Sequence, residues 1–351
     1  MSARPDRVPV TILTGFLGAG KTTLLNRILR ERHGLRIAVI ENEFGSESVD
    51  ADILVRDEAE EIVQLDNGCL CCNIRGDLLR ALAELANGRA AGRYQFDHVV
   101  VETSGMADPG PVAQSLSSDP ETAQAYRHEC IVTVVDALHG ADTLLTRQEA
   151  RAQVAYADRL VLTKTELAGE AATAAIVHHA IALNPAAQIL DASAAQADLA
   201  ELLLAQSADE PSRARQTPAP ALQALHGSDV GALTFVAHRP FDPARLEHFL
   251  AATVDICGVD LFRCKGVLWV EGCDTKVVLQ GVQLTMRVSA GSPWPSASAR
   301  RSKIVLIGRE LPVDELRDSL RRCLVDGSAD DEATPGVAYV PMASKPRGWL
   351  L

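Results

Sequence analysis

The glycine-rich stretch at residues 15–22, with the pattern GxxxxGKT, has residue types and spacing suited to holding a polyphosphate. Glycines let the backbone turn tightly, so that several N–H groups and a helix N-terminus can face the phosphates. Lys21 would reach the β- and γ-phosphate oxygens, and the Thr22 hydroxyl would ligate Mg²⁺. The stretch therefore predicts a nucleoside-triphosphate site formed by Gly15, Gly18, Ala19, Gly20, Lys21, Thr22 and Thr23.

Two polar residues after the next apolar run could complete this site. Glu102 ends the run and would hold a metal-bound water, and Gly105 could place its N–H near a γ-phosphate. The alternative for Glu102 is an ordinary carboxylate at a strand end. Asp136 ends a later run, where a site residue and a solvated turn are equally supported. The residues that we expect to act in catalysis are Lys21, Thr22 and Glu102.

The tetrapeptide TKTE at residues 163–166 follows another apolar run and could contact a base. A carboxylate at Glu166 could accept hydrogen bonds from the ring N–H and amino group of guanine, which adenine cannot reciprocate. Lys164 and Glu166 are therefore predicted to bind the base. Taken alone, the tetrapeptide fits an ordinary strand-to-helix turn equally well.

Three of the eight cysteines crowd into four positions, at Cys69, Cys71 and Cys72. Thiolates two residues apart can hold one soft or borderline cation, whereas adjacent cysteines point in different directions unless the backbone is irregular. We therefore do not expect all three to bind at once. Glu41 and Glu43, in the segment ENEFG, could supply oxygen ligands. The alternative is that the cysteines are small buried residues.

The elements that must position these residues are short apolar runs alternating with helical stretches. The runs at 8–13, 37–40, 98–101, 131–135 and 159–163 predict strands that are covered on both faces. The predicted fold is thus an α/β parallel sheet of the P-loop NTPase class with helices on both faces. Further strands are predicted at 232–237, 267–270, 276–284 and 303–307, with helices from 243 and over 312–324, as in a small α+β domain.

Composition divides the chain into four parts. We expect residues 1–206 to form the P-loop domain and the Ala-, Pro- and Ser-rich stretch 207–228 to be a linker. Residues 229–325 form the α+β domain, and the acidic tail 326–351 is expected to be partly disordered.

The overall composition excludes some classes of partner. A net charge of −12 argues against nucleic acid as the main partner. No apolar run approaches the roughly 20 residues that span a bilayer, and the first residues lack a signal-peptide core. We therefore expect a cytoplasmic protein with no membrane partner, in which a disulfide framework is not favoured.

In their order along the chain, these motifs resemble the CobW family of P-loop GTPases, which are metallochaperones and metalloenzyme activators, and most closely its YjiA-like branch. The resemblance covers roughly residues 7–325, and its C-terminal part resembles the domain that characterises CobW proteins. The segments that carry it are GFLGAGKTT, ENEFG, NGCLCC, ETSGMADPGP, VVDALH, YADRLVLTKTE, FRCKGVLWVEG, LQGVQ and IVLIG.

The resemblance implies GTP hydrolysis coupled to binding and delivery of a transition metal, usually Zn²⁺ and otherwise Co²⁺ or another transition metal, to a client metalloprotein. The chain would be a monomer or a weak homo-oligomer. The family's metal motif falls on Cys69, Cys71 and Cys72, beside Glu41 and Glu43. Its Walker B position falls on Glu102, and its guanine motif falls on Lys164 and Glu166.

The sequence departs from the family pattern at three points. The guanine motif NKxD reads TKTE, with Thr163 in place of Asn and Glu166 in place of Asp. After ENEFG many relatives carry another Glu, whereas this chain has Ser46 followed by Glu47. The histidine-rich tracts of some relatives are missing, and the only adjacent pair is His178-His179.

These features predict a two-state switch, in which GTP and Mg²⁺ organise the metal segment and hydrolysis loosens it. Hydrolysis should be slow without a partner. Two alternatives stay open. One is a P-loop kinase acting on a small metabolite, and the other is a non-catalytic nucleotide-dependent regulator.

Overall fold

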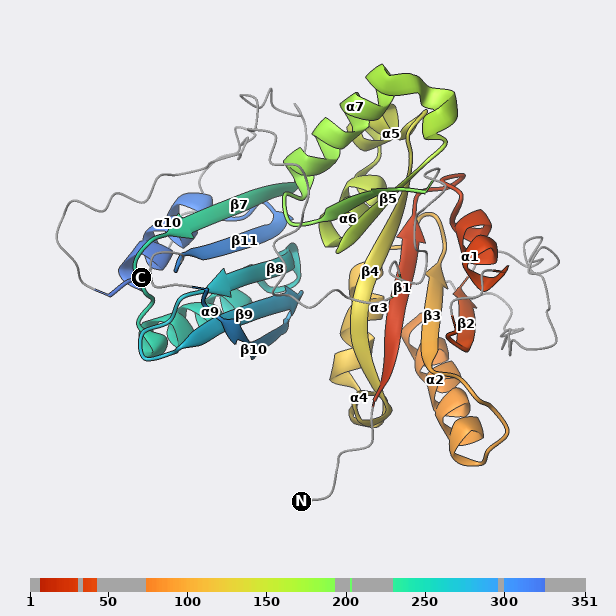
Figure 1. Cartoon of the computed structure of the whole chain (residues 1–351), viewed down its shortest axis with the longest axis horizontal. Helices are drawn as coiled ribbons and strands as arrows, with labels where there is room; N and C mark the ends of the chain where they lie inside the picture. The colour runs from red at the N-terminus through yellow and green to blue at the C-terminus, as the bar shows by residue number, and fades with distance from the viewer. Residues whose placement is uncertain are drawn as a thin grey trace.

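The computed structural model describes residues 7–30, 34–42, 74–192, 203, 230–295 and 300–325 of the 351-residue chain. Its first sheet has six parallel strands in the order β2-β3-β1-β4-β5-β6 (Figure 1). The strands are β1 (Val8–Gly15), β2 (Ile37–Asn42), β3 (His98–Thr103), β4 (Tyr126–Asp136), β5 (Arg159–Thr163) and β6 (Gln188–Asp191). The five predicted strands of this sheet are confirmed, and β6 extends its edge.

Helices cover both faces of this sheet, because successive strand residues point to opposite sides and both sides are apolar. Val99 belongs to the core cluster that includes Leu82 of α2, whereas its neighbour Val100 belongs to the cluster that includes Leu25 of α1. The predicted α/β fold is therefore confirmed. The helices are α1 (Lys21–Arg30), α2 (Ile74–Ala90), α3 (Pro109–Ser118), α4 (Pro120–Ala125), α5 (Gly140–Thr146), α6 (Gln148–Tyr156) and α7 (Thr165–Leu183).

The second sheet has five antiparallel strands in the order β10-β9-β8-β11-β7. The strand predicted at 267–270 begins earlier and ends at Leu268, and the run predicted at 276–284 ends at a turn where Gln283 has φ 48°. The strands are β7 (Val230–Ala237), β8 (Leu261–Leu268), β9 (Thr275–Val282), β10 (Thr285–Pro293) and β11 (Ser302–Arg309). The helices α9 (Pro243–Cys257) and α10 (Val313–Arg322) contribute to one core with this sheet.

The two sheets lie side by side, and α6 packs between them (Figure 1). The rings of Tyr156, the last residue of α6, and Phe262 of β8 stack with their centroids 4.8 Å apart. Gln283 Nε2 donates to Tyr156 Oη at 2.8 Å. Because Val305 and Ile307 of β11 belong to the same core cluster as Tyr156, one apolar core continues from the first sheet into the second.

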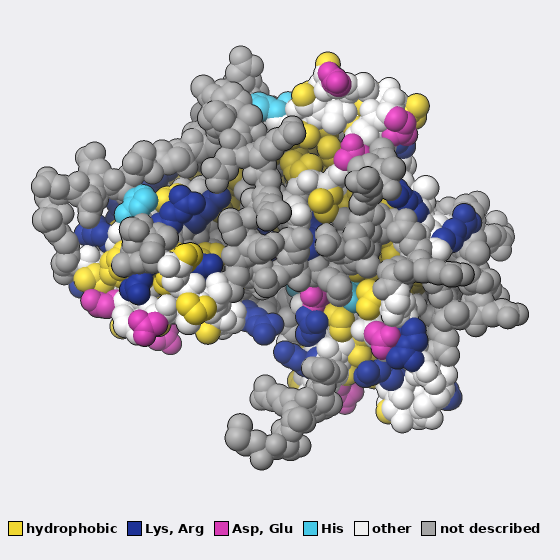
Figure 2. Space-filling model, viewed as in Figure 1, with side chains coloured by type: hydrophobic (Ala, Val, Ile, Leu, Met, Phe, Trp, Pro, Cys, Tyr) yellow, Lys and Arg dark blue, Asp and Glu magenta, His cyan; other side chains and the backbone are white. Residues whose placement is uncertain are grey.

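The surface shows no single sign of charge on the face drawn in Figure 2, where Lys and Arg side chains lie on both sheet regions with Asp and Glu side chains among them. Among the described helices, none combines the length and the apolar composition needed to cross a membrane.

Candidate nucleotide-binding site

The glycine-rich loop connects β1 to α1 and turns sharply at three glycines. Gly15, Gly18 and Gly20 have φ values of 145°, 73° and 95°, which side chains disfavour. A Cβ on Gly15 would lie 2.3 Å from the carbonyl oxygen of Val134, so glycine is the residue that fits there. Since α1 begins at Lys21, the loop wraps the N-terminus of this helix. This is the geometry that binds phosphates.

Lys21, Thr22 and Glu102 meet at the carboxyl ends of β1 and β3. The Lys21 Nζ atom donates to the Gly15 carbonyl oxygen at 3.0 Å and thus folds back over the loop. Thr22 Oγ1 donates to Glu102 Oε1 at 3.1 Å, and Glu102 is only 5% exposed. A hydroxyl and a carboxylate are hard oxygen donors, so this pair fits Mg²⁺. Thr23, by contrast, is exposed on the first turn of α1.

Gly105 lies against the glycine-rich loop. A Cβ on Gly105 would lie 2.6 Å from Leu17 Cδ2 and 2.8 Å from Leu17 Cα. The backbone N–H of Ala107 donates to the Ser104 carbonyl oxygen at 3.1 Å, which closes a turn around Gly105. The segment after β3 therefore approaches the phosphate loop too closely for any residue with a side chain at position 105.

The TKTE segment is tied to the same loop. Thr163 Oγ1 donates to the Ala19 carbonyl oxygen at 2.7 Å. Lys164 Nζ donates to the Gly18 carbonyl oxygen at 2.9 Å and to Asp136 Oδ2 at 2.7 Å. Glu166 lies exposed in the first turn of α7.

Asp136, for which the sequence supports a site residue and a solvated turn equally, makes contacts of both kinds. It pairs with Lys164, and its Oδ1 accepts from the backbone N–H of Leu138 at 2.7 Å. Burial alone would raise the pKa of Asp136, but the Lys164 hydrogen bond and the backbone N–H groups lower it below its usual value. A carboxylate held ionised in this way keeps Lys164 in place over the loop.

One of the five expected transition-metal ligands can be placed. Glu41 pairs in register with Glu102 where β2 and β3 run side by side, so its strand reaches the same edge of the sheet. Glu43, Cys69, Cys71 and Cys72 lie outside the described residues. Within the described ranges, no group of three or more His, Cys, Asp or Glu side chains could hold a metal ion.

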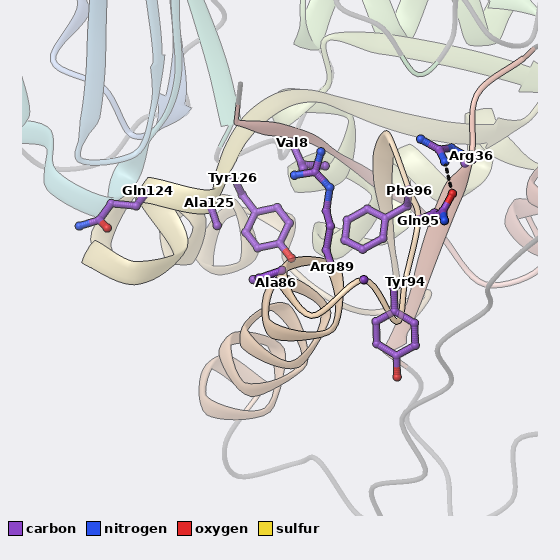
Figure 3. Close-up of a pocket in the computed structure, with 12 residues that line it drawn as sticks. Val8, Arg36, Ala86, Arg89, Tyr94, Gln95, Phe96, Gln124, Ala125 and Tyr126 are labelled. Atoms are coloured by element: carbon purple, nitrogen blue, oxygen red, sulfur yellow. Dashed lines mark hydrogen bonds between the residues drawn. The ribbon is translucent and has the colours of Figure 1, made fainter. Parts of the chain in front are cut away.

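Two hollows differ in size and in position. A pocket of about 220 Å³ adjoins the glycine-rich loop and is lined by Phe16, Asp136 and Lys164. A larger hollow of about 540 Å³ is lined by Val8, Arg89 and other residues around Phe96 (Figure 3). The larger hollow lies where β1 and β4 begin, whereas ligands of parallel α/β sheets bind at the carboxyl ends of the strands. We therefore place the site at the smaller pocket.

Gln153 is a residue near this site that the sequence analysis does not predict. It is buried on α6, and its side chain donates to the segment after β3. A single glutamine in an Ala-rich helix belongs to no motif, so only the structure indicates it.

Comparisons with known proteins agree with this geometry. Residues 9–191 match the family described as "CobW/HypB/UreG, nucleotide-binding domain". Residues 230–324 match the family described as "Cobalamin synthesis protein cobW C-terminal domain".

Similar proteins include zinc chaperones. The zinc chaperone YjiA of Escherichia coli is 38% identical over 312 residues, which cover 88% of this chain and 96% of the relative. The zinc chaperone CobW of Pseudomonas aeruginosa is 32% identical over 351 residues, covering 91% of this chain and 92% of the relative. A crystal structure of Zn(II)-bound YjiA GTPase from E. coli has a TM-score of 0.70 and 32% identity, covering 91% of this chain and 99% of its own. Because the two family matches together reach from residue 9 to residue 324, the chain belongs to the CobW/HypB/UreG family and carries the CobW C-terminal domain.

Proposed function

We propose that this chain is a GTPase that works as a zinc chaperone. It binds Zn²⁺, or another transition metal, as cargo and delivers it to a client metalloprotein in a step coupled to GTP hydrolysis. Relatives named as zinc chaperones and the similar fold of a Zn(II)-bound GTPase support the proposal. The observation within the chain that carries it is the Thr22–Glu102 pair, 3.1 Å apart beside the phosphate loop.

The described residues suit the phosphate chemistry. Backbone N–H groups of the loop would hold the phosphates, and Lys21 would swing from the Gly15 carbonyl onto the β- and γ-phosphate oxygens. Thr22 and Glu102 would hold Mg²⁺, which supplies neutralisation of the charge that develops on these oxygens. Gly105 would offer its N–H to the γ-phosphate. Hydrolysis should be slow without a partner, because positioning alone gives modest acceleration.

The link between nucleotide and cargo would run along β2. Glu41 lies next to Glu102 in the sheet, and the chain leads from Glu41 to Glu43 and then to the cysteines. Loss of the γ-phosphate would loosen this segment and release the metal. Since thiols must lose protons to bind a metal, the affinity for Zn²⁺ should rise with pH.

A Zn²⁺ titration of the nucleotide-free, GDP-bound and GTP-analogue-bound chain tests the cargo site. We expect Cys71→Ala to lower the Zn²⁺ affinity at least about tenfold, because a thiolate ligand is lost. Cys273→Ala is the matched control, since Cys273 is a partly exposed free thiol far along the chain and should not change the affinity. Unchanged affinity and stoichiometry in Cys71→Ala, in every nucleotide state, would refute the proposed coupling.

Guanine selectivity should depend on Glu166. The single hydroxyl proton of Thr163 is engaged by the Ala19 carbonyl, so Thr163 has no second proton for the base. We expect Glu166→Ala to reduce the preference for GTP over ATP by about 10- to 100-fold, because the acceptor for the guanine N–H groups is lost. Competition binding with GTP and ATP measures this ratio. Glu170→Ala, an exposed glutamate on the same helix, should leave it unchanged. An unchanged ratio in Glu166→Ala would remove Glu166 from the base site.

A further inference from the structure

Gln153 connects α6 to the turn that carries Gly105. Its side chain is fully buried, and Nε2 donates to the carbonyl oxygens of Gly105 at 3.2 Å and of Ala107 at 3.0 Å. Both partners are carbonyl oxygens, so the amide nitrogen must be the atom that faces them. The backbone of Gln153 is fixed as well, because Thr133 Oγ1 of β4 donates to its carbonyl oxygen at 2.8 Å.

Burying the side-chain amide of Gln153 lowers the stability of the fold. Within the described part of the chain, its Oε1 atom is buried and has no hydrogen-bond partner. A buried polar atom without a partner destabilises the fold by about 1–3 kcal/mol. A Met or Leu side chain would fill similar space without this cost. What Gln153 provides and an apolar side chain cannot is therefore the pair of hydrogen bonds to the carbonyls of Gly105 and Ala107.

These hydrogen bonds act on the segment that faces the phosphates. Gly105 is confined between Leu17 of the phosphate loop on one side and Gln153 on the other. The carbonyls of positions 105 and 107 lie on the turn closed by the Ala107-to-Ser104 hydrogen bond. The Gly105 N–H shares its peptide plane with the Ser104 carbonyl, which accepts the Ala107 N–H. Holding the carbonyls of positions 105 and 107 leaves this turn little freedom, and therefore also limits the direction of the Gly105 N–H.

The helix that carries Gln153 is itself anchored to the second sheet. Tyr156, one turn later and fully buried, stacks on Phe262 and accepts the hydrogen bond from Gln283. A Cβ on Gly110, in the first turn of α3, would lie 2.4 Å from Tyr156 Oη and 2.4 Å from Gln283 Nε2. The turn of Gly105 is thus followed by α3, which packs against the same Tyr156 and Gln283 side chains.

We propose that Gln153 is a positioning residue for GTP hydrolysis, which holds the Gly105–Ala107 turn so that the Gly105 N–H meets the γ-phosphate. This inference rests on the proposed GTPase function. It assigns Gln153 an indirect role, because the side chain contacts the turn and not the nucleotide. GDP lacks a γ-phosphate, so the role concerns GTP and its hydrolysis and not GDP binding.

The test compares Gln153→Met and Gln153→Glu in the full-length chain. Met removes both donors at similar size, and Glu keeps the shape but places acceptors opposite the two carbonyls. We expect kcat for phosphate release from GTP to fall about 10- to 100-fold in both variants, since small displacements of a positioned group have effects of this size. GDP affinity should stay within about threefold of the parent, because only the γ-phosphate contact is lost. Gln148→Met, at the exposed start of the same helix, is the control and should keep the parent kcat.

Every outcome of this test either supports or overturns the role proposed for Gln153. A parent kcat in both Gln153 variants overturns it, and so does an equal loss of GDP and GTP affinity, which indicates a merely structural role. If neither variant folds, Thr133→Val removes the hydroxyl that donates to the Gln153 carbonyl with little change of shape; a lowered kcat with unchanged GDP affinity is then expected, and parental kinetics overturn the inference. If the parent chain itself releases no phosphate from GTP, the proposed function fails, and that result is distinguishable from a failure confined to Gln153.

Discussion

Replacing Lys21 with alanine should lower the rate of GTP hydrolysis by about 10²–10³-fold, the usual effect of losing one preorganised charge or donor at a reacting group. The Lys21 ammonium lies 3.0 Å from the Gly15 carbonyl oxygen, within reach of the phosphates that the loop would hold. Without it, negative charge that develops on the γ-phosphate oxygens loses its nearest cation. Phosphate release with saturating Mg²⁺ and GTP measures the effect.

Lys276→Ala is the matched control for this experiment. Lys276 Nζ donates to Ser292 Oγ at 2.9 Å on the second sheet, away from the phosphate loop. We expect this variant to hydrolyse GTP at the parent rate and both variants to keep the parent thermal unfolding temperature. Equal rates for Lys21→Ala and the parent would contradict the assignment of residues 15–22 as the phosphate loop.

The first sheet could be predicted from the sequence because its strands are buried on both faces. Such strands are continuous apolar runs, which stand out from the helices between them. The sequence analysis does not predict the helices α3 and α4. The composition of α3 is rich in Pro, Ser and Gly, which is typical of loops, and α4 has only six residues. Both nevertheless begin with an Asp N-cap followed by Pro, as α9 does at Asp242-Pro243, where this signal predicts the helix. The same signal, applied between β3 and β4, would have predicted them.

The strand β10 shows a different limit. Its residues are largely exposed, and at the sheet edge it needs no apolar alternation. The turn before it depends on Gln283, which adopts φ 48° while its side chain bonds to Tyr156 of the other sheet region. Such a conformation is stabilised by a tertiary contact, so local sequence preferences do not indicate it.

The residues of the candidate site also differ in whether the sequence alone could predict them. The motifs indicate Lys21, Thr22, Glu102 and Gly105, because these residues lie in two short segments, each at the end of a strand. The pairing of Asp136 with Lys164 and the contacts of Gln153 join segments that are far apart in the sequence. Only the strand order brings those segments together. The ligand set of the cysteine segment stays a prediction.

Replacing Asp158 with asparagine should lower the free energy of unfolding by about 3–5 kcal/mol, because it leaves the buried Arg263 cation without its counter-charge. The Asp158 carboxylate pairs with Arg263 and with Lys265 at 3.1 Å, both from β8. Side-chain exposure is only 10% for Asp158 and 4% for Arg263. This cluster joins the start of β5 to the second sheet, so its loss weakens the contact on which α6 is also anchored.

The pH dependence of this effect has a definite sign. Burial alone would raise the pKa of Asp158, but Arg263 and Lys265 hold that pKa well below its ordinary value of 3.8. Its contribution to stability is therefore complete above pH 3.8 and is lost as the pH falls toward the lower pKa of the folded state. Urea unfolding at pH 7 should show the full difference between the parent and Asp158→Asn.

Asp260→Asn is the control, since Asp260 and Arg309 lie 3.8 Å apart and are 51% and 36% exposed. This variant should lower the free energy of unfolding by no more than about 1 kcal/mol. Equal costs for the two variants would show that the buried cluster contributes no more than a surface ion pair.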